Sequence, residues 1–219
     1  LAWVACCVGA GAPGPANPAG FASAAMGEDQ TFALGAQRRL AERPGGAWAV
    51  RLSAAAARYD YESSGQQIDG RFAPVQALAV REWYSGPRYA AVGLGPRYVR
   101  TRLTPDDPGN DRQGSQLDAV VTAETGWYGA TWRAQVYGEY GVDQRAHYVR
   151  ADARRRIRGP WRAGGEIFTH GDPAYDRAGA GVLVSRDLND GAEARLSLGW
   201  EARDRGDGVY VGLGWTGTL

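Results

Sequence analysis

The sequence predicts an all-β protein, an antiparallel up-and-down transmembrane β-barrel. Three observations lead to this prediction: apolar residues recur at every second position of segments near ten residues long, turn residues separate these segments, and Trp and Tyr gather near segment ends. Successive side chains of a strand point to opposite faces, so each segment has one apolar and one polar wall. A membrane barrel turns the apolar wall toward lipid and the polar wall toward its lumen.

The segment ARLSLGWEARD, residues 194–204, shows the alternation most clearly. Leu196 and Leu198 fall on one face, and Arg195 and Glu201 on the other. Periodicity alone also fits a soluble, lipocalin-like closed barrel with an apolar interior. Apolar faces rich in Ala and Val make a thin soluble core but suit lipid, and aromatic residues at strand ends suit a membrane interface. The aromatic residues of this predicted girdle are Trp48, Trp83, Tyr84, Trp127, Tyr128, Trp132, Trp161 and Trp215.

Strand candidates follow one another from about residue 47 to the C-terminus. Short connections at 85–87, 125–130, 158–160 and 186–191 alternate with longer, more polar ones such as ESSGQQID and HGDPAYD. Short turns at one rim and longer loops at the other are typical of outer-membrane barrels. The pattern favours ten strands. Residues 31–39 form an eleventh candidate, which breaks the even count and leaves twelve strands as the alternative.

The N-terminal part divides into two segments before the barrel. Residues 1–25 are interpreted as a secretory signal without its basic start, because an apolar stretch precedes small residues at Ala22 and Ala24. A disordered Ala/Gly/Pro tail is the alternative. Residues 26–46 form a segment of uncertain structure, and residues 47–219 form the barrel.

Composition narrows the partners and cofactors. The chain has 25 basic and 24 acidic residues, for a net charge of +1, so no strong field attracts nucleic acid. Both cysteines, Cys6 and Cys7, lie in the predicted signal, so the barrel has neither a disulfide framework nor a cysteine-based metal site. Outer-membrane lipid is the expected surrounding, with no nucleic acid partner and no cofactor.

The alternation places charges of both signs in the lumen. Unpaired buried charges are costly, so the prediction is a cross-strand network of Arg and carboxylate groups that fills the interior. A narrow polar passage is the alternative. The residues predicted to face inward are Asp118, Glu124, Arg133, Glu139, Arg150, Asp152, Arg154, Arg156, Arg162, Glu166, Glu193, Arg195, Glu201 and Arg203.

Catalytic patterns are weak. The chain has two histidines, His147 and His170, both expected at strand ends on the long-loop side. A lipid hydrolase would need a serine and an acid near one of them, and Ser185 and Glu166 are the candidates beside His170. Ordinary hydrogen bonds at the rim are the preferred interpretation, so we expect no enzymatic activity, no catalytic residue and no metal.

The most specific stretch of the chain is RLTPDDPGNDRQGSQLDA, residues 102–119. The prolines fix φ, Gly109 and Asn110 tolerate positive φ, and Asp106 and Asp107 are expected to bond amides of the loop itself. Polysaccharide or divalent-cation binding is the alternative, although the spacing of a calcium loop is absent. The candidate extracellular loop comprises Leu103, Thr104, Pro105, Asp106, Asp107, Pro108, Gly109 and Asn110.

With GGEIFTHGDPAYDRAGAGVLVS (164–185) and EARLSLGWEARDRGDGVYVGLGW (193–215), this loop resembles the cellulose biosynthesis protein S family, BcsS, of Gram-negative bacteria. The resemblance runs from about residue 47 to the end. A hairpin strand usual in the family after its first strand is missing from the pattern, which leaves residues 31–46 without a role.

The resemblance implies an outer-membrane barrel linked to cellulose production or export, and it carries over no catalytic residue. A structural or interaction function is therefore expected, with cellulose or other cellulose-secretion components as candidate partners. The alternatives are a small pore or adhesin unrelated to cellulose and, third, a lipid-modifying enzyme.

Overall fold

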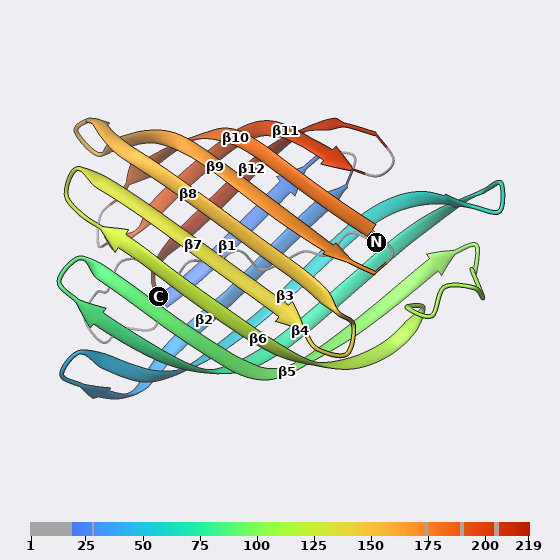
Figure 1. Cartoon of the computed structure of the whole chain (residues 1–219), viewed down its shortest axis with the longest axis horizontal. Coiled ribbons are helices and arrows are strands. Elements are labelled where there is room, and N and C mark those ends of the chain that lie inside the picture. Colours follow the sequence, from blue (N-terminus) through green and yellow to red (C-terminus); the bar gives the residue numbers. More distant parts are fainter. Residues whose placement is uncertain (1–18, 28, 174, 189–190, 204–205) are drawn as a thin grey trace.

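The computed structural model describes residues 19–27, 29–173, 175–188, 191–203 and 206–219. In this part of the chain, twelve antiparallel strands form one closed barrel in which each strand pairs with its sequence neighbours and β1 pairs with β12 (Figure 1). The strands are β1 (Ala19–Met26), β2 (Gln30–Arg43), β3 (Gly46–Ser63), β4 (Gln66–Ser85), β5 (Arg88–Thr104), β6 (Gly114–Tyr128), β7 (Trp132–Gly141), β8 (Ala146–Arg158), β9 (Trp161–Asp172), β10 (Tyr175–Asp187), β11 (Glu193–Arg203) and β12 (Gly208–Thr218).

The favoured count of ten strands is wrong, and the alternative of twelve is correct. The uncertain candidate 31–39 lies within β2, and the missing partner is β1, whose eight residues AGFASAAM include the end of the predicted signal. Ala19–Met26 pairs along its whole length with β12 and with β2, so the barrel includes residues before position 47, from Ala19 onward in the described part of the chain. Because most of its side chains are small, this strand shows no clear alternation of apolar and polar residues in the sequence. Residues 1–18 lie outside the described part.

The two faces of the sheet have the predicted orientation. Leu196 and Leu198 are each 51% exposed on the outer surface, whereas Ser197 and Glu201 between and beyond them are 6% and 0% exposed. A soluble barrel with an apolar interior would reverse this pattern. Among the described residues no helix is long or apolar enough to cross a membrane.

The rim at which β1 begins and β12 ends is formed by short turns, and tryptophans lie along its outer edge. Trp48, Trp83, Trp127, Trp132 and Trp161 are exposed near the strand ends of this rim, as expected for an interfacial girdle. An arginine lies over each ring: Arg81 over Trp48 and Trp83, Arg88 over Trp127, Arg155 over Trp132 and Arg186 over Trp161.

Two residues predicted for the girdle, Tyr84 and Tyr128, are instead inside the barrel. Tyr84 packs against Tyr89 with ring centroids 5.7 Å apart, and Tyr128 packs against the same ring at 6.4 Å. The guanidinium of Arg39 also lies over the Tyr84 ring, 4.9 Å from its centroid, a cation contact that a lipid-facing position would not offer.

At the opposite rim, β3 and β4 extend well past the other strands (Figure 1). They contain 18 and 20 residues, whereas about 10 residues cross a bilayer. The predicted loop ESSGQQID is therefore mostly strand, and its turn is only residues 64–65. Ser64 and Gly65 both have positive φ, 52° and 77°, which matches the turn that a two-residue hairpin requires.

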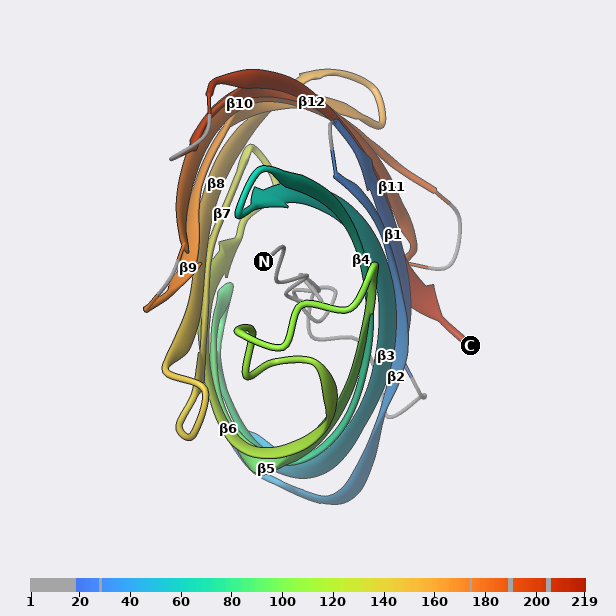
Figure 2. The same cartoon turned by 90° about the vertical axis from the view of Figure 1, so that its right-hand side faces the viewer.

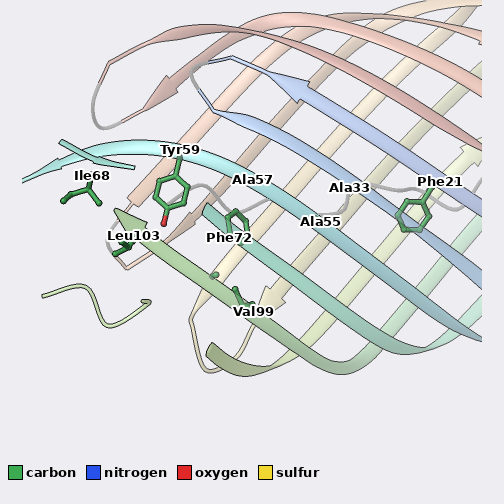
Figure 3. Close-up of a cluster of buried hydrophobic side chains, with 10 residues drawn as sticks. Phe21, Ala33, Ala55, Ala57, Tyr59, Ile68, Phe72, Val99 and Leu103 are labelled. Atoms are coloured by element: carbon green, nitrogen blue, oxygen red, sulfur yellow. The ribbon is translucent and has the colours of Figure 1, made fainter. Parts of the chain in front are cut away.

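The inner surface of β3 to β5 is more apolar than predicted. Near the projecting rim, Tyr59, Ile68, Phe72, Val99 and Leu103 form a buried cluster (Figure 3). A second buried cluster with Leu78, Val80 and Tyr89 lies toward the short-turn rim. This apolar inner wall explains why segments of β3 to β5 are apolar on both faces in the sequence. The charged part of the lumen lies largely against β6 to β12.

Candidate functional site

The charged lumen and the loop at its mouth are the candidate site. Eight of the predicted inward residues are less than 9% exposed: Asp118, Glu124, Glu139, Asp152, Arg154, Arg162, Glu166 and Glu201. The side chains of Arg133, Arg150, Glu193, Arg195 and Arg203 are between 5% and 19% exposed and form ion pairs within the barrel. Arg156 is the exception, because its side chain is 46% exposed at the rim and reaches Asp187 at 3.5 Å.

Arg97 of β5 is the centre of the first ion-pair group. Its guanidinium donates to Glu139 of β7 and to Asp118 of β6, each at 2.6 Å. The hydroxyl of Tyr137 donates to the other oxygen of Glu139 at 2.9 Å. A Cβ at Gly141 would lie 2.2 Å from Asp118 Oδ2 and 2.3 Å from Arg97 Nη2, so a larger residue there would displace the ends of both side chains.

A second group links β2, β3, β4 and β6. Arg39 donates to Glu82 at 2.9 Å, and the amide of Gln37 donates to the other Glu82 oxygen at 2.7 Å. Arg51 donates to the Gln37 carbonyl oxygen at 2.8 Å and to Glu124 at 3.3 Å. One continuous chain of polar contacts therefore runs from β2 to β6, four strands away in the barrel.

A third group joins β7 and β8 to β10 and β11. Arg133 donates to Asp187 at 2.6 Å and to Glu193 at 2.5 Å, and Arg154 also pairs with Glu193. In the order of strands around the barrel, these partners lie three or four strands apart, so their side chains meet across the lumen.

A fourth group occupies the middle of the same half. Glu166 of β9 pairs with Arg150 and accepts a hydrogen bond of 2.8 Å from the Tyr210 hydroxyl of β12. Arg195 of β11 reaches Asp152 of β8 at 3.3 Å. The Arg150 pair joins the neighbouring strands β8 and β9, whereas the Tyr210 and Arg195 contacts join strands that are not neighbours in the sheet.

The mouth holds a fifth group. Arg177 pairs with Glu201 and, at 3.1 Å, with Asp29 in the β1–β2 connection, and Arg203 pairs with Glu201 as well. Burial raises the pKa of the Asp29 carboxyl above its ordinary value, while Arg177 and Arg203 oppose that rise.

The ion pairs span the interior because the barrel is oval in cross-section, as Figure 2 shows. A cavity of about 130 Å³ remains beside Arg150, Glu166, His170 and Arg195. Ligand pockets for small molecules usually measure about 300–1,000 Å³, and liquid water occupies about 30 Å³ per molecule. This cavity therefore has the size for a few water molecules.

The predicted extracellular loop lies across the open end of the barrel in Figure 2. Leu103 and Thr104 still belong to β5, and the connection itself is residues 105–113. Arg112 pairs with Asp172 of β9, on the far side of the mouth. The Tyr61 hydroxyl of β3 donates to Asp107 at 2.8 Å and accepts from the Asn110 amide at 2.9 Å.

The internal bonding of this loop differs from the prediction. The carboxylates of Asp106 and Asp107 bond side chains, those of Gln113 and Tyr61, whereas we expected loop amides. Asn110 does bond the loop backbone, since its side-chain oxygen accepts from the Arg112 amide at 3.1 Å. The left-handed φ of 100° is at Gly114 and not at Gly109 or Asn110. Anchoring by Tyr61 and Asp172 depends on strands distant in sequence, which the loop pattern alone does not contain.

The proposed hydrolase arrangement is not assembled. His170 is opposite Arg177 on β10, whereas Ser185 lies eight positions further along the same strand, opposite Arg162. At about 3.4 Å per residue the separation is roughly 27 Å, too far for a serine to transfer its proton to the imidazole. His170 is buried next to Tyr148, with ring centroids 6.5 Å apart.

Several members of the lumen network were not predicted from the sequence. Arg51, Glu82 and Arg97 lie on β3 to β5, where apolar residues on both faces obscured the alternation. Counting every second residue from Tyr89, past the interruption at Pro96, would have reached Arg97. Arg112 and Asp172 carry no sequence signal, because only the folded barrel brings them together.

Comparisons with solved structures support the architecture. The chain is similar to the β domain of the Bordetella autotransporter BrkA, with a TM-score of 0.57, 14% identity and coverage of 93% of this chain and 99% of that chain. It is also similar to the transport unit of the autotransporter AIDA-I from Escherichia coli, with a TM-score of 0.54, 8% identity and coverage of 93% and 89%. A comparison with curated proteins finds no match.

The closed twelve-stranded barrel with an apolar outer surface and a charged lumen defines the class of transmembrane β-barrels. The family model described as cellulose biosynthesis protein BcsS matches residues 19–218, nearly the whole described barrel. The chain belongs to the BcsS family, and it is a β-barrel associated with cellulose biosynthesis. The match also includes β1 and β2, so residues 31–46 are part of the family's barrel.

Proposed function

We propose that this protein is an accessory component of cellulose production in the outer membrane of a Gram-negative bacterium, with a structural or interaction function and not a catalytic one. The carrying observation is the lumen: ion pairs such as Arg133 with Asp187 join non-neighbouring strands, inside a barrel of the BcsS family. A passage for a glucan chain would need an interior that these contacts do not offer.

The energetics support a lumen that stays assembled. Breaking a buried ion pair by removing one partner costs about 3–5 kcal/mol, so opening several pairs together for a polymer is expensive. The loop 105–113 adds contacts across the mouth through Arg112 and Tyr61. A barrel of this kind is suited to hold partners or to organise the membrane around an export machine formed by other chains.

Deleting the gene tests the link to cellulose. We expect less surface cellulose, measured as cellulase-released glucose, and recovery when the wild-type gene is supplied from a plasmid. Unchanged cellulose in the deletion strain would contradict the proposal and favour a barrel with a task unrelated to cellulose.

Filling the lumen cavity separates an accessory barrel from a glucan pore. Ser197 and Thr31 both line the 130 Å³ cavity, and Ser197→Phe and Thr31→Phe would occupy it independently. Each variant that still shows the heat-modifiable gel mobility of a folded barrel is expected to restore cellulose to the wild-type amount. Loss of cellulose in a folded variant, together with glucan-blocked conductance of wild-type protein in planar bilayers, would favour the pore.

A further inference from the structure

Four arginines gather on the outer face of the barrel where the lipid-facing surface of β3 to β5 ends. In the ladders, Arg58 of β3 is opposite Arg71 of β4, and Arg71 is opposite Arg102 of β5. Arg100 is two residues before Arg102 on the same face, opposite Ala73. All four side chains are exposed, and the strands continue below them with the outward apolar residues Val75 and Tyr98.

This arginine patch is electrostatically unfavourable as it stands. Like charges directly opposite each other in a sheet are destabilising. Arg58 has an acidic neighbour, Asp69, at 3.4 Å in an exposed position, but among the described residues Arg71, Arg100 and Arg102 have no carboxylate partner. At the other rim, the outward residues Arg81, Arg88, Arg155 and Arg186 differ, because each lies over a tryptophan ring. A row of this kind calls for a bound anion.

An open groove lies beside the arginine patch. Its volume is about 870 Å³, and its apolar floor includes Met26 and Phe32, which are 61% and 49% exposed, together with Ala56 and Ala73. The floor is continuous with the apolar outer surface of the barrel. Arginine side chains border it on the side of the projecting hairpin.

We propose that the arginine patch binds the phosphorylated sugar headgroup of an outer-leaflet glycolipid of the lipid A class, with acyl chains on the apolar floor. The guanidinium group matches phosphate geometry and forms paired, charge-assisted hydrogen bonds. Arginines directly above an apolar surface place phosphate at the membrane interface, where a lipid headgroup lies. A free anion would need only the arginines, whereas the exposed apolar floor beside them fits the acyl chains of a lipid. The floor therefore favours a lipid as the occupant.

Lipid binding to the purified full chain tests the proposal. The probe is bisphosphorylated lipid A titrated into the protein in uncharged detergent micelles, followed by native mass spectrometry, and its dephosphorylated form with the same acyl chains is the comparison. Wild-type protein is expected to bind the phosphorylated lipid at least about tenfold more tightly. Arg71→Gln/Arg100→Gln/Arg102→Gln is expected to weaken binding by about 100-fold. Each arginine near an anionic surface raises the affinity about fivefold, and the variant removes three of them.

The matched control removes the same charge from the other rim. Arg81→Gln/Arg155→Gln/Arg186→Gln is expected to bind within about threefold of wild type. Equal weakening in both triple variants, equal affinity for the dephosphorylated lipid, or no lipid binding at all would overturn the proposal, and the last result would favour an acidic protein partner. Displacement of the lipid by inorganic phosphate alone at millimolar concentration would assign the site to a free anion and equally overturn it. All the substituted residues lie on the outer surface, where Arg81 is half-buried and the others are exposed, so both variants are expected to fold.

Discussion

Removing the guanidinium of Arg97 is expected to destabilise the barrel by several kcal/mol. Arg97 is 3% exposed and holds Asp118 and Glu139, whose side chains are 0% and 6% exposed, through two contacts of 2.6 Å. Arg97→Met keeps much of the side-chain volume but leaves both carboxylates without their cation. Removing one partner of a buried ion pair costs about 3–5 kcal/mol, and we expect the free energy of unfolding of Arg97→Met to fall by this amount or more.

The measurement is equilibrium urea unfolding in lipid vesicles, followed by tryptophan fluorescence, with heat-modifiable gel mobility as the check of assembly. Arg58→Met is the control, because Arg58 and Asp69 are about half exposed, and an exposed pair contributes at most about 1 kcal/mol. The variant Arg97→Met/Asp118→Asn/Glu139→Gln removes all three charges and is expected to recover most of the stability.

Two results would refute this reasoning about the lumen. One is a loss for Arg97→Met no larger than that for Arg58→Met, which would mean that water reaches the carboxylates. The other is the absence of recovery when Asp118 and Glu139 are neutralised together with Arg97. In either case the ion pairs would not be the interactions that hold the lumen together.

Three further predictions concern other parts of the barrel. Gly141→Ala is expected to cost at least about 1 kcal/mol in the same unfolding assay, because the added methyl group displaces the pair that Arg97 forms with Asp118; an unchanged midpoint would count against the close packing. Arg112→Gln is expected to speed amide hydrogen exchange and proteolytic cleavage within residues 105–113, and protection equal to wild type would show that its ion pair does not hold the loop. The pKa of Asp29 is raised in the folded state, so its favourable contribution is present at low pH and is lost as pH rises through that pKa; wild-type stability relative to Asp29→Asn should therefore rise from neutral toward acid pH, and a fall would contradict the shift.

The sequence was sufficient to predict the fold class and the orientation of most strands, because alternation is a property of the backbone. Leu198 outside and Glu201 inside follow from a period of two residues once lipid is chosen as the outer solvent. The choice itself depended on the thin apolar face and on tryptophans such as Trp132 and Trp161, which lie where the interface requires them.

Strand number could not be predicted in the same way. The segment AGFASAAM has small residues on both faces, so β1 carries almost no periodic signal, and its evidence is its pairing with β12 at the closure of the barrel. Short stretches of small residues also occur near signal cleavage sites, which made the wrong boundary reasonable.

For the candidate site, the sequence predicted which residues face the lumen better than it predicted which of them form ion pairs with one another. Alternation placed Asp118 and Glu139 in the lumen, but their cation, Arg97, follows a proline in a strand whose inner face is otherwise small or apolar. Contacts such as Arg112 with Asp172 join residues far apart in sequence and depend on the oval closure of the barrel. Pairing across a lumen is a tertiary property that a single sequence does not encode locally.

Quenching by brominated lipid tests the orientation of the sheet most directly. A fluorophore is attached at single cysteines introduced along β11, from Ala194→Cys to Ala202→Cys, in a chain whose Cys6 and Cys7 are replaced by serine and which is reconstituted in vesicles. Labels at 196, 198 and 200 are expected to be strongly quenched, and labels at 197, 199 and 201 to be protected, with a period of two. Strong quenching at 197 and 201 with protection at 196 and 198 would contradict the account.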